Sequence, residues 1–91
     1  MSVVVSIPVT LRHLTGESKL IESRGATLIE VLDILFQDYP DLRPRVLRSE
    51  TRAQRFLNIY VDGTDVRYLD GLRSRVPEGG RVDITVALAG G

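Results

Sequence analysis

The sequence predicts an α+β fold in which a mixed sheet of four or five strands covers one main helix. Apolar residues alternate along two segments near the ends of the chain, 3–9 and 82–88, as in half-buried strands. Between residues 28 and 39 they recur at helical spacing instead. We expect the first and last strands to pair in parallel, because the helix then lies within the crossover connection between them.

The chain begins with a predicted β-hairpin. Val3, Val5 and Ile7 start an alternating pattern that reaches Val9, and Pro8 places the end of this strand at an edge or a bend. Residues 15–18 are a turn signal, and residues 19–23 are expected to return as an antiparallel second strand. A short connection over residues 24–26 then leads to the helix.

The main helix is predicted to begin after Thr27 and to end at Pro40. Thr27 and Glu30 have the spacing of a capping box, in which each side chain accepts a hydrogen bond from the other residue's backbone N–H. Pro40 disfavours continuation of the helix. One face is apolar and is interpreted as core rather than as a cofactor site; it comprises Leu28, Val31, Leu32, Leu35 and Tyr39.

An arginine-rich stretch follows the helix. Residues 41–49 are expected to hold one short helical turn that buries Val46 and Leu47. The basic side chains of the stretch are Arg43, Arg45, Arg48, Arg52 and Arg55. A solvated face is the default interpretation of such a run, and a docking patch for an acidic partner is the alternative.

The second half of the chain supplies the remaining strands. Residues 56–61 alternate as a third strand, Asp62-Gly63 is a turn signal, and residues 66–68 are expected to form a short strand or edge. Leu69 and Leu72 are expected to be small plugs beneath a long connection, and residues 77–80 form the last turn. With the final strand placed centrally beside the first, this order of elements describes a β-grasp, the ubiquitin-like fold.

The third strand also predicts a docking surface. Three of its side chains are expected to face the helix: Leu57, Ile59 and Val61. The other face of the sheet then holds Phe56 and Tyr60 beside Thr85 and Ala87. Two exposed aromatic side chains on one patch are typical of a partner anchor. The alternative is that the connection over residues 62–75 covers them.

Composition argues against several classes of function. Lysine plus arginine and aspartate plus glutamate both number 12, a balance that disfavours a dedicated nucleic-acid binder. The chain has no cysteine, and its single histidine, His13, is interpreted as a surface or turn residue, so we expect no metal site. No apolar run approaches the length of a membrane span. We expect one cytoplasmic domain over residues 1–91, without membrane contact.

The final strand runs directly into two glycines. We interpret the carboxylate of Gly91 as the working group of the protein. Leu88, Ala89 and Gly90 are expected to form a flexible tail with it, residues 88–91, that passes into another protein's site. Glycine has no Cβ, so it fits a narrow channel and accepts any φ and ψ that the channel imposes. Four extended residues reach at most about 13 Å. The alternative is an unstructured terminus without function.

Three parts of the chain resemble known proteins. Residues 56–67, and residues 77–84 together with the terminal Gly90-Gly91, resemble the ubiquitin-like sulfur carriers of the MoaD/ThiS family. Residues 5–8, 11–12 and 15–16 are similar to the CysO-type subgroup of that family, which feeds cysteine synthesis.

Two positions depart from the family pattern. Gly79-Gly80 stand where members often have Gly-Asp, and Ala87-Leu88 stand where many have Pro-Pro. These departures disfavour a molybdopterin-synthase subunit more than they disfavour the family, because the Gly-Gly end is intact.

The resemblance implies a carrier rather than an enzyme. In the family's cycle, an E1-like adenylyltransferase and sulfurtransferase uses ATP and Mg²⁺ to convert the terminal carboxylate, here that of Gly91, to an acyl-adenylate. A sulfur donor then displaces AMP and leaves a thiocarboxylate, which donates sulfur to a client enzyme such as a cysteine synthase. The chain has no phosphate-binding loop of its own, so ATP is expected to bind to the partner. We therefore expect no catalytic residue and no bound cofactor.

Other functions remain open at the level of sequence. Within the same fold they are the small subunit of molybdopterin synthase, a thiamine-thiazole sulfur carrier and a ubiquitin-like modifier of lysines. The alternative of a different class is a non-catalytic β-grasp binding module that contacts RNA through the arginine-rich stretch.

Overall fold

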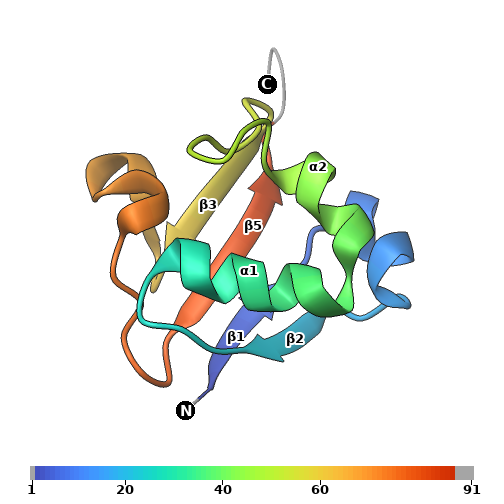
Figure 1. Ribbon diagram of the computed structural model, residues 1–91, viewed down its shortest axis with the longest axis horizontal. Coiled ribbons are helices and arrows are strands. Elements are labelled where there is room, and N and C mark those ends of the chain that lie inside the picture. Colours follow the sequence, from blue (N-terminus) through green and yellow to red (C-terminus); the bar gives the residue numbers. More distant parts are fainter. Residues whose placement is uncertain (1, 88–91) are drawn as a thin grey trace.

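A computed structural model describes residues 2–87 of the chain (Figure 1). The strands are β1 (Val3–Ser6), β2 (Leu20–Ser23), β3 (Leu57–Val61), β4 (Thr64–Asp65) and β5 (Arg81–Val86). The α-helices are α1 (Leu28–Asp38) and α2 (Arg43–Val46). Short 3₁₀ helices span Val9–Thr15, Pro40–Leu42, Val66–Tyr68 and Gly71–Arg73.

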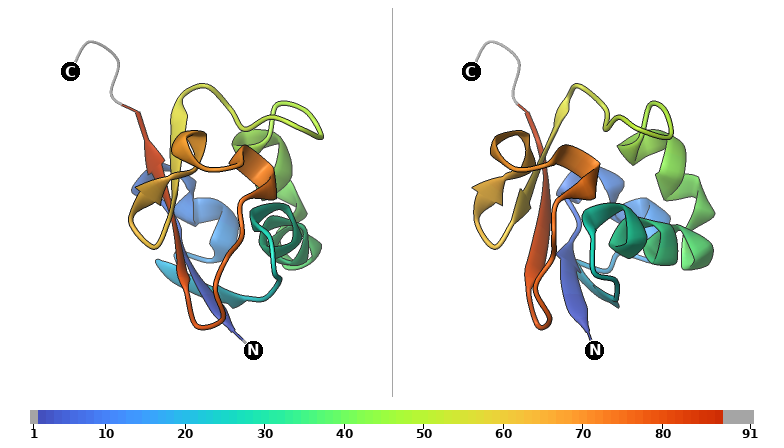
Figure 2. Two further views of the ribbon diagram at one scale, coloured as in Figure 1. Left: turned by 90° about the vertical axis from the view of Figure 1, so that its left-hand side faces the viewer. Right: turned by 60° about the vertical axis from the view of Figure 1, so that its left-hand side comes forward.

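The five strands form one mixed sheet in the order β2-β1-β5-β3-β4. β5 is central, as predicted: it pairs in parallel with β1, where Val5 lies opposite Val82, and antiparallel with β3, where Ile59 lies opposite Ile84. The α-helices lie on one side of this sheet in both views of Figure 2. The arrangement confirms the predicted β-grasp.

The connection between β1 and β2 differs from the prediction. The first strand was expected to reach Val9, but β1 ends at Ser6 and residues Val9–Thr15 form a 3₁₀ helix. Pro8 precedes this helix, and its carbonyl accepts a hydrogen bond from the N–H of Leu11 at 2.9 Å. Leu11 is buried in the core, so its packing favours a chain that leaves the sheet after Ser6.

Helix α1 follows the prediction closely. Both halves of the capping box are present: Thr27 Oγ1 accepts from the N–H of Glu30, and Glu30 Oε1 accepts from the N–H of Thr27. The predicted apolar face is buried except for Tyr39, which is half-buried, and the structure adds Phe36 to it.

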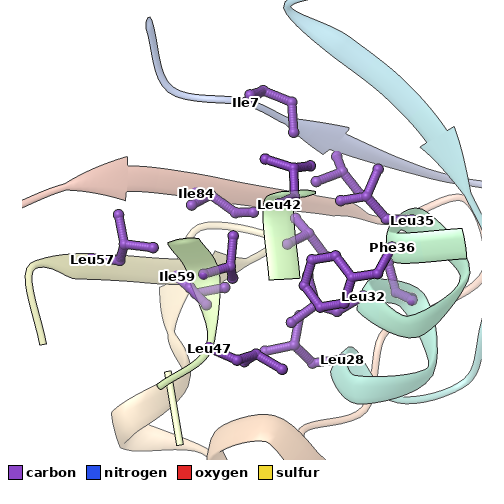
Figure 3. Packing of buried hydrophobic residues seen from close by; sticks show 14 of the residues in the cluster. Ile7, Leu28, Leu32, Leu35, Phe36, Leu42, Leu47, Leu57, Ile59 and Ile84 are labelled. Carbon is purple, nitrogen blue, oxygen red and sulfur yellow. The ribbon is translucent and has the colours of Figure 1, made fainter. Parts of the chain in front are cut away.

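The core lies between α1, α2 and the sheet. Figure 3 shows Leu32 and Phe36 of α1 on the same side of the sheet as Ile59 of β3 and Ile84 of β5. Val46 and Leu47 of the arginine-rich stretch are also buried, as predicted. Leu57, Ile59 and Val61 all face this core.

The turn predicted at Asp62-Gly63 is confirmed, and the strand that follows it starts earlier than predicted. Asp62 and Gly63 have φ values of 48° and 87°, which is the positive-φ geometry of a two-residue type I′ turn. β4 therefore starts at Thr64, and the short strand expected at residues 66–68 is instead a 3₁₀ helix. The Asp65 carboxylate accepts a hydrogen bond from the N–H of Arg67 at 2.8 Å and so caps this helix.

Two further expectations for this region have different outcomes. Leu72 packs against the core as a plug, whereas Leu69 is 45% exposed and does not. The turn over residues 77–80 is confirmed by a hydrogen bond from the N–H of Gly80 to the carbonyl of Pro77 at 2.8 Å. The final strand, expected over 82–88, is β5, and Leu88 lies outside the described residues.

Candidate functional site

The predicted site lies at the end of the central strand. After β5 the described chain ends at Ala87, whose N–H donates a hydrogen bond of 2.7 Å to the carbonyl of Phe56. The last described residue is thus still held beside the start of β3. The predicted tail residues lie outside the described part of the chain: Leu88, Ala89, Gly90 and Gly91.

The four predicted docking residues share the face of the sheet opposite α1. The register of β3 and β5 places Thr85 opposite Asn58, and Phe56 lies beside Ala87 two pairs further along. Tyr60 lies on the other side of Asn58 from Phe56. The side chains of this face alternate with the buried ones along both strands, so the structure brings the four residues together on one surface.

Exposure differs between the two aromatic residues. Phe56 is 49% exposed, whereas Tyr60 is half-buried. The connection over residues 62–75 was the predicted alternative as a cover for both. It reaches the middle of the face, at Asn58, and leaves Phe56 accessible.

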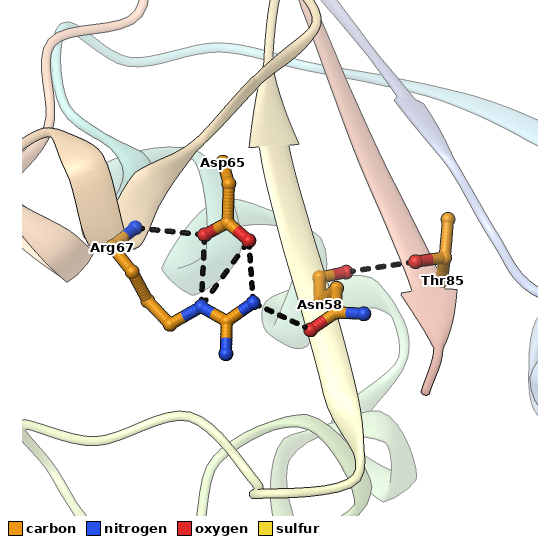
Figure 4. A network of polar contacts seen from close by, with 4 residues as sticks. All are labelled: Asn58, Asp65, Arg67 and Thr85. Carbon is orange, nitrogen blue, oxygen red and sulfur yellow. Dashed lines mark hydrogen bonds and ion pairs between the residues drawn. The ribbon is translucent and has the colours of Figure 1, made fainter. Parts of the chain in front are cut away.

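The contact between this connection and Asn58 belongs to a network of polar contacts (Figure 4). Arg67 Nη2 donates to Asp65 Oδ2 at 2.7 Å and to Asn58 Oδ1 at 3.2 Å, and Arg67 Nε donates to Asp65 Oδ1 at 3.1 Å. Thr85 Oγ1 donates to the carbonyl of Asn58 at 3.4 Å. The network thus joins one residue from each of β3, β4, β5 and the 3₁₀ helix Val66–Tyr68. It lies at the middle of the face, because Asn58 stands between Phe56 and Tyr60 along the chain.

The Asp65–Arg67 pair also changes the acidity of its members. The side chain of Asp65 is only 10% exposed. Hydrogen bonds from the Arg67 guanidinium hold the pKa of Asp65 below its ordinary value, although burial works in the opposite direction. The same contact raises the pKa of Arg67.

Sequence reasoning did not identify Asn58, Asp65 and Arg67 as members of this surface. The sequence contained part of the evidence for this placement. Asn58 alternates with the two aromatic residues, and Asp65 and Arg67 closely follow a hairpin turn. The contact of Arg67 with Asn58 depends on how the chain turns after Asp65. A strand was expected at residues 66–68, so the position of Arg67 could not be predicted.

The remaining candidates behave as ordinary surface features. His13 is exposed in the 3₁₀ helix Val9–Thr15. No three histidine, aspartate or glutamate side chains among residues 2–87 are grouped so that they could hold a metal ion. Within the same part of the chain, no helix is both long and apolar enough to cross a membrane.

Arg43 has a structural role within the arginine-rich stretch. Its Nη1 lies 3.2 Å from Asp33 Oδ1 of α1, and its guanidinium carbon lies 5.7 Å from the centre of the Phe36 ring. It therefore fastens α2 to α1 by an ion pair and a cation–π contact.

Comparison with known proteins covers almost the whole chain. The ThiS family model matches residues 5–91. The sulfur carrier protein CysO of Mycobacterium tuberculosis is 40% identical over 93 residues, which include all of both chains. A putative sulfur carrier protein of Archaeoglobus fulgidus is 28% identical over the full length of both.

Solved structures agree with this result. A chain of the Amycolatopsis orientalis BexX/CysO complex matches with a TM-score of 0.90 and 40% identity, covering 98% of this chain and 99% of that one. The crystal structure of Mycobacterium tuberculosis CysO also matches with a TM-score of 0.90, at 38% identity and with coverage of 94% and 99%.

Proposed function

The chain is a sulfur carrier of the ThiS family, and we propose that the carboxylate of Gly91 is the group that carries the sulfur. The observation that supports this assignment is the full-length similarity to a sulfur carrier, combined with a central strand that ends at Val86, shortly before Gly90-Gly91 in the sequence. The protein is a cosubstrate of other enzymes and not a catalyst.

The fold suits a carrier because the described chain ends at a residue that is held against the sheet. Ala87 is bonded to Phe56 at the end of the sheet, so the residues that follow it start from a fixed point. Leu88, Ala89, Gly90 and Gly91 are the segment that we propose to enter a partner's site. Gly90 and Gly91 have no side chains to obstruct a narrow channel.

The proposed chemistry takes place in two steps. In the first, the Gly91 carboxylate attacks the α-phosphorus of ATP in the site of an E1-like activating enzyme, which also holds Mg²⁺, and pyrophosphate leaves. In the second, hydrosulfide attacks the acyl carbon and AMP leaves. The product loses a proton and becomes a thiocarboxylate, a nucleophile that hands its sulfur to a client enzyme.

We assign the client to cysteine biosynthesis, with a cysteine synthase as the acceptor of sulfur. The support is the similarity to CysO-type carriers and the departures from the family pattern at Gly79-Gly80 and Ala87-Leu88, which disfavour a molybdopterin-synthase subunit. The cycle consumes ATP, and we place it in the cytoplasm.

We further propose that the activating enzyme docks on the open face of the sheet. Phe56, Tyr60, Thr85 and Ala87 form this docking face. Its support is the 49% exposure of Phe56 immediately beside the start of the tail. A partner that grips this face has the Gly-Gly end within reach of its own site.

An intact-mass measurement tests the proposal. After incubation with the cognate activating enzyme, ATP, Mg²⁺ and sulfide, the carrier should gain about 16 Da, the difference between sulfur and oxygen. Omission of ATP is the control and should leave the mass unchanged.

Three tail variants locate the reacting group. Deletion of Gly91 moves the carboxylate back by about 3.5 Å, Gly90→Val adds a β-branched side chain, and one extra residue after Gly91 converts its carboxylate into a peptide bond. None of them should gain sulfur. All three should melt within about 1 °C of the wild type, because they change no buried side chain. Sulfur loading of any of them at the wild-type rate would show that Gly91 is not the carrier group.

A further inference from the structure

We propose that a cleft along the free edge of β3 binds an extended, acidic segment of a partner protein, which adds to the sheet as a strand. We call it the arginine cleft. Its volume is about 730 Å³, and four arginines and two buried residues of β3 line it: Arg48, Arg52, Arg55, Arg67, Leu57 and Ile59.

Backbone groups of β3 point toward this cleft. On the β5 side, the carbonyl of Phe56 accepts from the N–H of Ala87 at 2.7 Å. Backbone groups in an antiparallel strand point to alternate sides from one residue to the next. The N–H and C=O groups of Leu57 and Ile59 therefore point away from β5 and toward the arginine cleft.

β4 is too short to cover this edge of β3. It pairs only with Tyr60 and Val61. The N–H of Leu57 donates to the carbonyl of Gln54 at 3.2 Å. The carbonyl of Leu57 and the N–H of Ile59 lie beyond the β4 ladder, where an added strand would supply one donor and one acceptor.

The lining of the arginine cleft carries positive charge. Residues 2–87 form three ion pairs, and none of them includes Arg48, Arg52 or Arg55. Arg67 is paired with Asp65, the one acidic residue of the cleft. The three other arginines leave the cleft positively charged although the whole chain has no net charge. Acidic side chains on the added strand would complement them.

Other occupants match these features less well. A nucleic acid would satisfy the arginines but has no peptide groups for the edge of β3. A second copy of this chain, added edge to edge, would bring its own arginines against these and be repelled. An acidic extended peptide satisfies both the edge and the charge.

The test uses the full chain and a blocked synthetic peptide of alternating glutamate and valine. Binding is followed by the shifts of backbone amide signals in ¹H–¹⁵N spectra. The strongest changes should fall on Asn58, Ile59 and residues 52–55. A peptide with lysine in place of glutamate, and one with alternate backbone amides methylated, should both fail to bind.

Charge reversal provides the matched comparison. Arg52→Glu combined with Arg55→Glu should weaken binding of the acidic peptide by about tenfold or more, because the lining loses its positive charge. Arg45→Glu should leave binding within about twofold, since Arg45 is exposed in the same stretch but outside the cleft. Retention of the amide spectrum confirms that each variant is folded.

Three outcomes would overturn the inference. One is the absence of shifts at millimolar peptide, and another is equal weakening by Arg45→Glu and by the double variant. The third is tighter, arginine-dependent binding of a single-stranded oligonucleotide, which would identify a nucleic-acid site instead. Because the readout is peptide binding and not sulfur loading, the proposed function and this inference can fail separately.

Discussion

At the scale of single residues, Gly25 is a position that no other residue can occupy without strain. Its φ is 146°, and a Cβ built there would lie 2.8 Å from both the Glu30 Cβ and the Val31 nitrogen of α1. The connection from β2 therefore passes so close to the first turn of α1 that only glycine fits.

We predict that Gly25→Ala lowers the free energy of unfolding by about 1–3 kcal/mol. Gly16→Ala is the matched control, because Gly16 also has a positive φ, 62°, but nothing lies within 4 Å of its Cβ position. Thermal or urea denaturation measures both. A loss for Gly25→Ala that does not exceed the loss for Gly16→Ala would show that the close approach to α1 is unimportant.

Asp65 provides a second prediction at this scale, on pH. Its pKa is lowered in the folded protein by the hydrogen bonds from Arg67. A lowered folded-state pKa means that the contact stabilises the fold fully above the ordinary pKa of an aspartate and is lost as the pH falls through the lowered value.

A carboxyl-carbon NMR titration checks this. The midpoint for Asp65 should lie below the ordinary aspartate value of 3.8 in the wild type and should rise in Arg67→Gln. In Arg43→Gln, which removes a different ion pair, the midpoint of Asp65 should not change. A midpoint that is the same in wild type and Arg67→Gln would contradict the assignment of Arg67 as the cause.

At the scale of elements, β3 has three distinct surfaces. One side faces α1 and the core, the other carries the docking face, and one edge faces the arginine cleft. A five-residue strand can serve three roles because its side chains alternate between faces while its backbone groups point along the sheet.

The docking face on β3 can be tested by removing one of its aromatic side chains. Tyr60→Ala should leave the fold intact and slow activation by the E1-like enzyme, because an aromatic anchor is lost from the proposed interface. Val9→Ala is the control: Val9 is 72% exposed, but it lies in the 3₁₀ helix after β1. Adenylation kinetics measure the effect. Unchanged kinetics in a folded Tyr60→Ala protein would remove this face from the interface.

At the scale of the whole molecule, the balance of charge limits the affinity of the protein for nucleic acid. With 12 basic and 12 acidic residues, it should bind RNA only weakly, with a Kd no lower than about 10⁻⁴ to 10⁻⁶ M, and this binding should weaken strongly as salt is raised. Fluorescence anisotropy with labelled oligonucleotides at two salt concentrations measures this. Sequence-specific binding in the nanomolar range at physiological salt would contradict the prediction.

The sequence alone determined those parts of the protein whose physics is local. The cap and the apolar face of α1 follow from Thr27, Glu30 and a spacing of three and four residues, all within a few turns of one helix. The alternation in β3 and β5 likewise assigned each side chain to a face. Residues 56–67 and 77–84, with the Gly-Gly end, were sufficient to recognise the family and to propose the Gly91 carboxylate as the carrier group.

The points at which the chain leaves the sheet could not be predicted from the pattern of the sequence. After Ser6 the local pattern still allowed a strand, but packing of Leu11 on the core favoured a 3₁₀ helix. After Asp65 the favouring contact is local, because the Asp65 carboxylate caps the N–H of Arg67 two residues later, and the alternating pattern did not reveal it. The exposure of Leu69 and the contact of Arg67 with Asn58 follow from the second of these turns. The arginine cleft also required the fold, because it joins residues 48–55 to residues 65–72 across an uncovered strand edge. Contacts between segments so far apart depend on how the elements pack, and no periodicity along the chain encodes them.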